Sequence, residues 1–158
     1  MKVVDAMQLE RMSDLAREVP RRRTHFNLHD ELTDPVQRVV IALEPGTYVR
    51  PHRHGDGVWE LFVVLEGACA VLIFDDEGSV IQRVQLIPGG ARLAQVPVGA
   101  WHSVVALAPG TIAFEVKPGP YVPATDKNFA AWAPQEGEPG TSAMVRWLEN
   151  AAVGERFS

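Results

Sequence analysis

The sequence predicts an all-β domain of the sandwich or barrel type, with one helix at each end. Pro-Gly pairs and other turn residues cut the middle of the chain into segments of about ten residues. These segments are rich in β-branched and aromatic residues, which favour strands. Many short strands at regular spacing are typical of sandwiches and closed barrels.

Eight segments are predicted strands, and they span residues 36–43, 47–52, 59–65, 69–74, 80–86, 93–96, 101–107 and 111–117. The segment 69–74 does not alternate between apolar and polar residues. Both of its faces must therefore be covered, either by a helix or by a second subunit. We expect a homodimer on this ground, unless the terminal helices cover the strand instead.

Apolar residues at helical spacing predict the two flanking helices: Leu9, Met12, Leu15 and Ala16 before the strands, and Met144, Val145, Leu148 and Ala151 or Ala152 after them. At 158 residues the chain fits one domain. We expect an N-terminal helical segment over 1–24, a β-barrel core over 36–118, and a tail with the second helix over 119–158. The three arginines at 21–23 are expected to close the first helix, where cations interact favourably with its dipole.

Composition excludes several classes of function. A formal net charge of −5 argues against general affinity for nucleic acid. Cys69 is the only cysteine, so neither a disulfide framework nor a thiolate zinc site is expected. Charged residues interrupt the apolar positions of the N-terminus, and no apolar stretch has membrane-spanning length. We expect a soluble cytoplasmic protein without a membrane or nucleic-acid partner.

The stretch "RPHRHGDGVWELFVVLEG", residues 50–67, contains candidate metal ligands. His52 ends a predicted strand and His54 follows it two residues later; because side chains two apart along a strand point to the same face, the two are expected to project together. The turn after them is expected to bring Glu60 beside the pair, and a Pro-Gly corner at 97–99 precedes His102. Three imidazoles and one carboxylate form a ligand set that Zn, Fe, Mn, Ni and Cu all accept. We therefore expect one divalent transition metal of unspecified identity.

The same residues carry a family resemblance. The pattern Gly46-x5-His52-x-His54-x5-Glu60-x6-Gly67 resembles the first cupin motif, and Pro97-x-Gly99-x2-His102 resembles the core of the second. Two departures are a longer gap before Glu60 and alanine at position 106, where the motif usually ends in asparagine; neither changes a ligand.

The resemblance extends beyond the motifs. The segments "DPVQR", "EPGTYVRPHRH", "WELFVVLEG", "FEVKPGPY" and "PATDKNFAAWAP" are similar to the WbuC-type cupin-fold metalloproteins. That family implies a double-stranded β-helix, or jelly-roll barrel, with a metal site, and an association with bacterial surface-polysaccharide clusters.

Further polar residues have two interpretations each. His25 and His29 lie in a predicted polar loop, where facing solvent is the simpler interpretation; alternatively this loop covers the barrel mouth, and Asn27 and His29 contact the substrate. Glu115 and Lys117 share one face of a strand, and a solvated face is again the simpler interpretation. In the alternative, an anionic or hydroxylated ligand is held by Arg38, Tyr48, Lys117 and Tyr121.

Three functions remain compatible with these residues. The first is a metalloenzyme of the isomerase, epimerase or lyase type that acts on a sugar-derived ligand in surface-polysaccharide metabolism. The second is an Fe(II)-dependent dioxygenase, because nitrogen and carboxylate ligands with open positions suit iron and dioxygen. The third is a barrel that binds a small molecule without catalysis. No residue is assigned a catalytic role.

Overall fold

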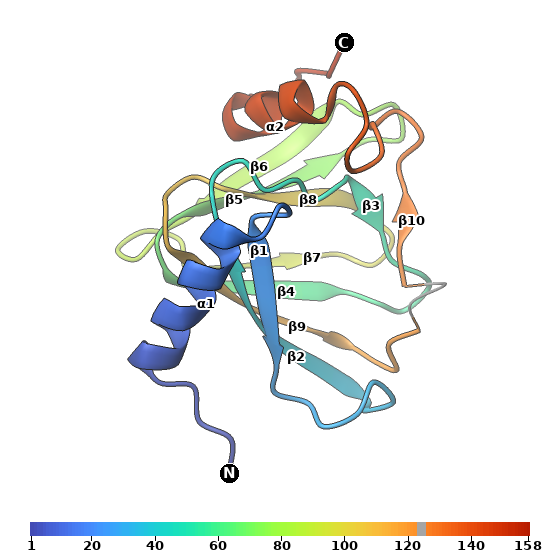
Figure 1. Cartoon of the computed structure of the whole chain (residues 1–158). Helices are drawn as coiled ribbons and strands as arrows, with labels where there is room; N and C mark the ends of the chain where they lie inside the picture. The colour runs from blue at the N-terminus through green and yellow to red at the C-terminus, as the bar shows by residue number, and fades with distance from the viewer. Residues whose placement is uncertain (123–125) are drawn as a thin grey trace.

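A computed structural model describes residues 1–122 and 126–158. Two five-stranded sheets face each other, and every paired strand runs antiparallel to its neighbour (Figure 1). The first sheet has the order β1-β2-β9-β4-β7 and the second the order β10-β3-β8-β5-β6. This architecture confirms the predicted all-β jelly roll with a helix at each end.

The elements, in chain order, are α1 (Ala6–Glu18), β1 (Arg23–Asn27), β2 (Val36–Leu43), β3 (His52–Arg53), β4 (Glu60–Glu66), β5 (Cys69–Phe74), β6 (Val80–Leu86), β7 (Leu93–Val96), β8 (Trp101–Ala106), β9 (Thr111–Pro118), β10 (Asn128–Phe129) and α2 (Thr141–Asn150). Seven of the eight predicted strands match these bounds to within one residue at each end. The exception is the predicted strand over 47–52, of which only its last residue lies in β3.

In that stretch, side chains rather than a neighbouring strand form hydrogen bonds with the backbone carbonyl groups. The Arg23 guanidinium donates to the carbonyl oxygen of Tyr48 at 2.8 Å, and the Ser103 hydroxyl donates to that of Val49 at 2.6 Å. These carbonyl groups are therefore satisfied without a β ladder, which the sequence pattern cannot show.

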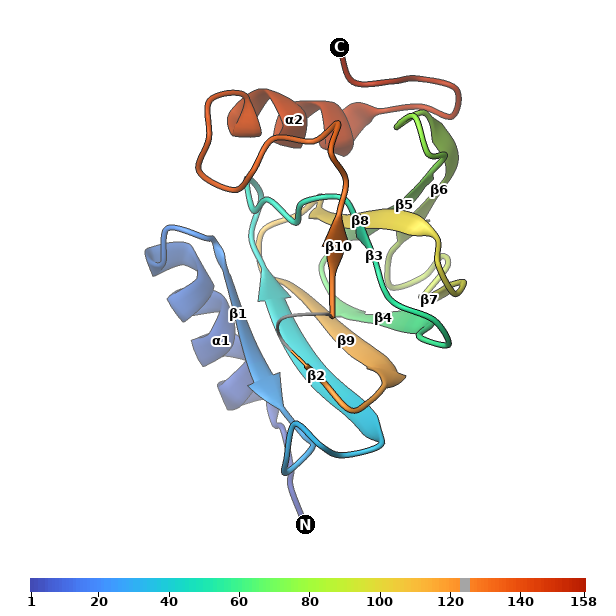
Figure 2. The ribbon, with the colours of Figure 1, turned by 90° about the vertical axis from the view of Figure 1, so that its right-hand side faces the viewer.

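Two strands were not predicted. β1 pairs with β2 along its whole length, in a region where the sequence indicated a helical segment followed by a loop. β10 pairs with β3 and places Phe129 opposite His52 (Figure 2). The arginine prediction is wrong: α1 ends at Glu18, and both Arg21 and Arg23 form ion pairs with Glu136 at 2.9 Å.

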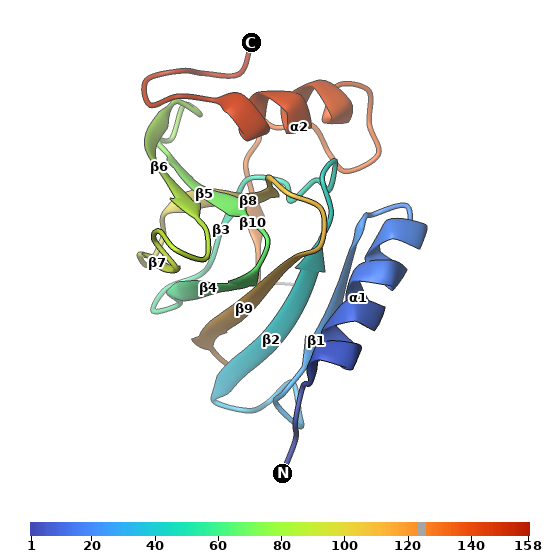
Figure 3. The ribbon, with the colours of Figure 1, turned by 90° about the vertical axis from the view of Figure 1, so that its left-hand side faces the viewer.

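Helix α1 covers the outer face of the first sheet (Figure 3). Its buried residues Met12 and Ala16 pack against Val40, Ala42 and Ile112. Because side chains alternate along a strand, the odd-numbered residues of β2, from Gln37 onward, face the space between the sheets. This alternation decides which polar side chains of β2 and β9 can reach a site inside the barrel.

Helix α2 covers the outer face of the second sheet. Met144 and Leu148 pack with Ala70, Leu72 and Phe74 of β5. The intervening residues of β5, Cys69 and Val71, belong to the apolar core between the two sheets. Helix α2 thus covers the outer face of β5, which was one of the two predicted ways to cover this apolar strand. This strand therefore no longer supports a dimer, and the dimer stays a prediction.

Within the described residues, no helix is long and apolar enough to cross a membrane.

Candidate metal centre

The four candidate ligands come together from both sheets. His52 on β3 and His102 on β8 are direct cross-strand partners in the second sheet. His54 follows β3, and Glu60 is the first residue of β4 in the first sheet. The Gly55–Gly57 turn therefore carries the chain from one sheet to the other. Glu60 faces the three histidines across the barrel.

Their potential ligand atoms all lie within 4.8 Å of one another. His102 Nε2 lies 2.9 Å from one carboxylate oxygen of Glu60, and His54 Nε2 lies 3.5 Å from the other. All four residues are at most 5% exposed. Four buried donor atoms this close together can hold a single ion.

Backbone carbonyl groups orient the three rings. The Nδ1 atoms lie 2.9 Å from the Arg50 oxygen for His52, 2.7 Å from the Asp126 oxygen for His54, and 2.9 Å from the Ala100 oxygen for His102. A carbonyl oxygen can only accept, so each Nδ1 carries the proton and each neutral ring presents the Nε2 lone pair to the centre. Such outer hydrogen bonds are typical of metal-ligating histidines.

Two of the three Nε2 atoms have no hydrogen-bond partner in the described part of the chain. They belong to His52 and His54, and both are buried. Buried polar atoms are almost always satisfied, and an unsatisfied one costs about 1–3 kcal/mol. A metal ion coordinated by both would remove that cost, so the residues present fit the expected metal.

The electrostatics favour the protonation states that a metal requires. Burial, together with the positive charge of Lys127, lowers the pKa of His52 well below its ordinary value. Burial alone would raise the pKa of Glu60, but the neighbouring His102 and His54 rings hold it well below the usual range. Neutral imidazole and ionised carboxylate are the metal-binding forms of these side chains.

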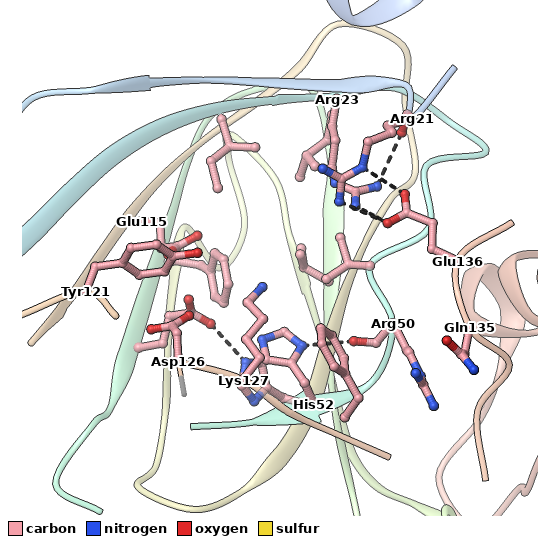
Figure 4. Close-up of a pocket in the computed structure, with 18 residues that line it drawn as sticks. Arg21, Arg23, Arg50, His52, Glu115, Tyr121, Asp126, Lys127, Gln135 and Glu136 are labelled. Carbon is pink, nitrogen blue, oxygen red and sulfur yellow. Dashed lines mark hydrogen bonds and ion pairs between the residues drawn. The ribbon is translucent and has the colours of Figure 1, made fainter. Parts of the chain in front are cut away.

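A cavity of about 530 Å³ opens beside the site, and three of the four ligands, His52, Glu60 and His102, line it (Figure 4). Core residues such as Phe62 and Val104 form its apolar wall. Its polar lining comes from four regions: the start of β1 and the residues before it, the residues before β3, β9 and the residues after it, and the segment around β10. The residues are Arg21, Arg23, Arg50, Glu115, Tyr121, Asp126, Lys127, Gln135 and Glu136. A second compartment of about 310 Å³, lined largely by β1 and β2, shares Glu115, Tyr121 and Lys127 with the first. The size and the mixed lining suit a small polar ligand.

Comparison with known proteins gives a family for the chain. Residues 4–86 match the model of the family described as "Domain of unknown function (DUF6016)". The chain belongs to this family. No curated protein matches the sequence of this DUF6016 chain.

Three solved structures of similar fold are distant in sequence. KdgF from Halomonas sp. is 21% identical over 66% of this chain and 85% of its own, with a TM-score of 0.51. The protein TT1209 from Thermus thermophilus is 23% identical over 75% and 97%, with a TM-score of 0.52. The capsular polysaccharide assembling protein CapF from Staphylococcus aureus is 18% identical over 67% and 32%, with a TM-score of 0.53. The DUF6016 chain thus spans about a third of CapF. These similarities confirm the predicted cupin fold, whereas the WbuC-type resemblance stays a prediction.

Glu115 and Lys117 point into the cavity of the DUF6016 chain, so the interpretation as a solvated face is wrong. The Lys117 ammonium lies 3.0 Å from Asp126 Oδ2, 3.6 Å from Glu115 Oε1 and 5.2 Å from the ring centroid of Tyr121. Burial opposes the charge of Lys117, but Glu115, Glu60 and Asp126 raise its pKa. Burial and the negative charge of Glu60 raise the pKa of Glu115 to about 8. Side chains of β9 alternate as predicted, but the face that carries Glu115 and Lys117 points into the barrel and not to solvent.

Four of the six predicted ligand-contacting residues line the cavity: Asn27, His29 and Lys117 in the second compartment, and Tyr121 in both. His29 is only 4% exposed, so its interpretation as a solvent-facing residue is wrong. His25 on β1 is exposed. That these four side chains contact a ligand remains a proposal.

The other two predictions fail for physical reasons. Arg38 lies on the α1 side of β2, where alternation directs it away from the cavity, and it pairs with Asp34 at 3.3 Å. Tyr48 is a core residue, and its hydroxyl donates to the Pro134 carbonyl oxygen at 2.8 Å. Burial of that phenol raises its pKa far above the usual range. Neither side chain lines the described cavity.

Sequence reasoning missed Asp126, Lys127 and Phe129, all of which line the cavity. They belong to the irregular segment before and within β10, where no periodic pattern marks an inward face. The only available signal was composition, since a tail with several aromatic residues is too apolar for a free linker.

Proposed function

We propose that this protein is a metal-dependent cupin that binds a small polar, sugar-derived ligand and acts on it as an isomerase, epimerase or lyase. The observation that carries the proposal is the convergence of four buried ligand atoms within 4.8 Å at the wall of a charged cavity. His52, His54, Glu60 and His102 would hold the metal. When bound, a divalent ion supplies Lewis-acid polarisation of a ligand oxygen.

The remaining residues supply binding and exclusion of water. Both carboxylates and cations line the cavity, which gives a hydroxylated ligand acceptors and donors. Phe62 and Val104 add an apolar part to the lining, which does not bind water. Phe129 lies with its ring centroid 6.1 Å from that of His52 and extends this apolar surface toward the ligand site.

The role in bacterial surface-polysaccharide metabolism has weaker support. It comes from the resemblance to WbuC-type cupins, and CapF, which shares the fold, is a capsular polysaccharide assembling protein. We propose surface-polysaccharide sugars as the first ligands to test, and a cytoplasmic location follows from the same proposal.

Elemental analysis and a ligand panel test the function together. Protein purified without a metal-affinity tag is expected to carry about one transition metal ion per chain. With metal present, neutral and acidic sugars are compared by thermal shift and by NMR detection of a product. Turnover supports the enzyme, whereas a thermal shift without product reduces the proposal to ligand binding. Failure to bind Zn, Fe, Mn or Ni at neutral pH would contradict it, and ligand-dependent oxygen uptake would favour the dioxygenase.

Chelation is expected to remove the metal without unfolding the protein. Three apolar clusters build the fold independently of the ligand atoms, and the 2.9 Å contact between His102 and Glu60 can persist as a hydrogen bond. Metal then adds only its mass-action contribution, about 2.7 kcal/mol at a hundredfold excess over the dissociation constant. Circular dichroism melts with and without EDTA measure this difference. Loss of the β spectrum at room temperature on chelation would show that the metal is structural.

A further inference from the structure

The lining of the two compartments has an excess of positive charge. Five basic side chains and four carboxylates line them, the basic ones being Arg21, Arg23, Arg50, Lys117 and Lys127, and the acidic ones Glu60, Glu115, Asp126 and Glu136. A divalent ion raises the formal balance to about +3 when all nine are ionised. The whole chain, in contrast, carries −5. The cavity therefore has the opposite sign to the rest of the protein, which concentrates anions within it.

Four of the five basic groups are already engaged. Arg21 and Arg23 share the Glu136 carboxylate, with both contacts at 2.9 Å. Arg50 donates to the Ala130 carbonyl oxygen at 2.9 Å and lies 5.3 Å from the Phe129 ring centroid. Lys117 pairs with Asp126. These side chains hold the cavity in shape and have little capacity left for a ligand.

Lys127 differs from the other four. Across residues 1–122 and 126–158 its ammonium group takes part in no ion pair or hydrogen bond. Its side chain extends into the cavity beside His52 (Figure 4). A half-buried cation without a partner is costly, and an anion bound beside it would offset that cost.

The backbone fixes Lys127 at this point. The backbone oxygen of its neighbour Asp126 accepts a hydrogen bond from His54 Nδ1. Phe129, two residues after Lys127, lies on β10 opposite His52 of β3. The segment that orients two metal ligands therefore also carries the unpaired ammonium group. Metal and cation are thus placed to contact one ligand at two points.

We propose that Lys127 binds an anionic group of the ligand, a carboxylate or a phosphate, while the metal holds an oxygen of the same molecule. The inference rests on the proposed function and narrows it to acidic sugars or sugar phosphates. Lys127 is a binding residue in this proposal, because its ammonium group would contact the ligand directly.

Isothermal titration of metal-loaded protein tests this contact. The probes are D-glucuronate, D-glucose 6-phosphate and neutral D-glucose, which share the sugar ring and differ in the anionic group. Lys127→Met removes the charge but keeps most of the stem, and Lys127→Arg restores a cation. Arg146→Met is the matched control, because it removes one positive charge from an exposed position on α2. Melting temperature and metal content are measured for every variant.

The metal-loaded wild-type protein is expected to bind at least one anionic probe more tightly than glucose. Lys127→Met should weaken that binding roughly ten- to hundredfold, the range for a hydrogen bond to a charged group. Lys127→Arg should recover most of it, and Arg146→Met should have no effect. Preference for glucuronate or for glucose 6-phosphate identifies the anion.

Three results would overturn the inference: no binding of either anionic probe at millimolar concentration, preference for glucose, or equal affinity in wild type and Lys127→Met. If glucose binds and the anions do not, the proposed function survives and only the anion assignment fails. If metal does not bind at all, the proposed function fails first. An equal loss in Lys127→Met and Arg146→Met would assign the effect to net charge alone.

Discussion

Replacement of any one of the three histidine ligands by alanine is expected to lower metal affinity more than about a hundredfold. Loss of an outer hydrogen-bonding partner alone costs about ten- to a hundredfold, and loss of the ligand itself removes a metal bond as well. The remaining ligands cannot move to compensate, because the strands of His52, His102 and Glu60 are paired with their neighbours and the His54 ring is held by the Asp126 carbonyl oxygen. Metal per chain after dialysis, measured by elemental analysis, gives the result.

The three variants should differ in stability. His52→Ala and His54→Ala each remove a ring whose Nε2 has no hydrogen-bond partner in the described structure. His102→Ala instead deprives the buried Glu60 carboxylate of its 2.9 Å contact, so it should melt lowest. His25→Ala, an exposed position on β1, is the control and should keep both metal and melting temperature. Full metal retention in all three ligand variants would contradict the assignment of this site.

The fold could be predicted because its signals are local. Turn residues and β-branched segments recur along the middle of the chain, and β2, β5, β6 and β7 have the predicted bounds. The short strands β1 and β10 lack such a signal. They are polar or brief, and they form because a neighbouring strand and side chains distant in sequence satisfy them. Tyr48 illustrates the same limit, since its partner Pro134 lies 86 residues further along the chain.

The sequence predicted which residues form the candidate metal centre, but not how they are arranged in space. A spacing of two places His52 and His54 on one side of the chain, which is a property of any strand. Which sheet carries Glu60 depends on how the turn at 55–57 leaves β3, and that follows from packing. Glu115 and Lys117 show the same division: alternation pairs them on one face, but only the position of α1 on the opposite side of the sheet decides that this face is inward.

Lys117→Met is expected to destabilise the protein by about 3–5 kcal/mol, the range for removal of one partner from a buried ion pair. The Asp126 carboxylate, only 8% exposed, would be left buried without its cation. Glu115, only 13% exposed, would lose the charge that now opposes the rise of its pKa to about 8. A lysine on a solvated face, as the simpler sequence interpretation had it, would change stability by less than about 0.5 kcal/mol. Urea denaturation distinguishes the two, because the midpoint of unfolding shifts only in the first case.

The double variant Lys117→Met/Asp126→Asn separates lost charge pairing from lost packing. The second substitution keeps the backbone carbonyl group that orients His54 and removes one uncompensated charge, so part of the stability should return. Lys2→Met is the control, since its ion pair with Asp30 is exposed and its loss should leave the midpoint unchanged. If the double variant is no more stable than Lys117→Met, the carboxylate of Asp126 is not what the ammonium group compensates. If Lys117→Met itself has the wild-type midpoint, Lys117 is not buried in this network, and the wall of the cavity that it forms with Asp126 and Tyr121 is wrongly placed.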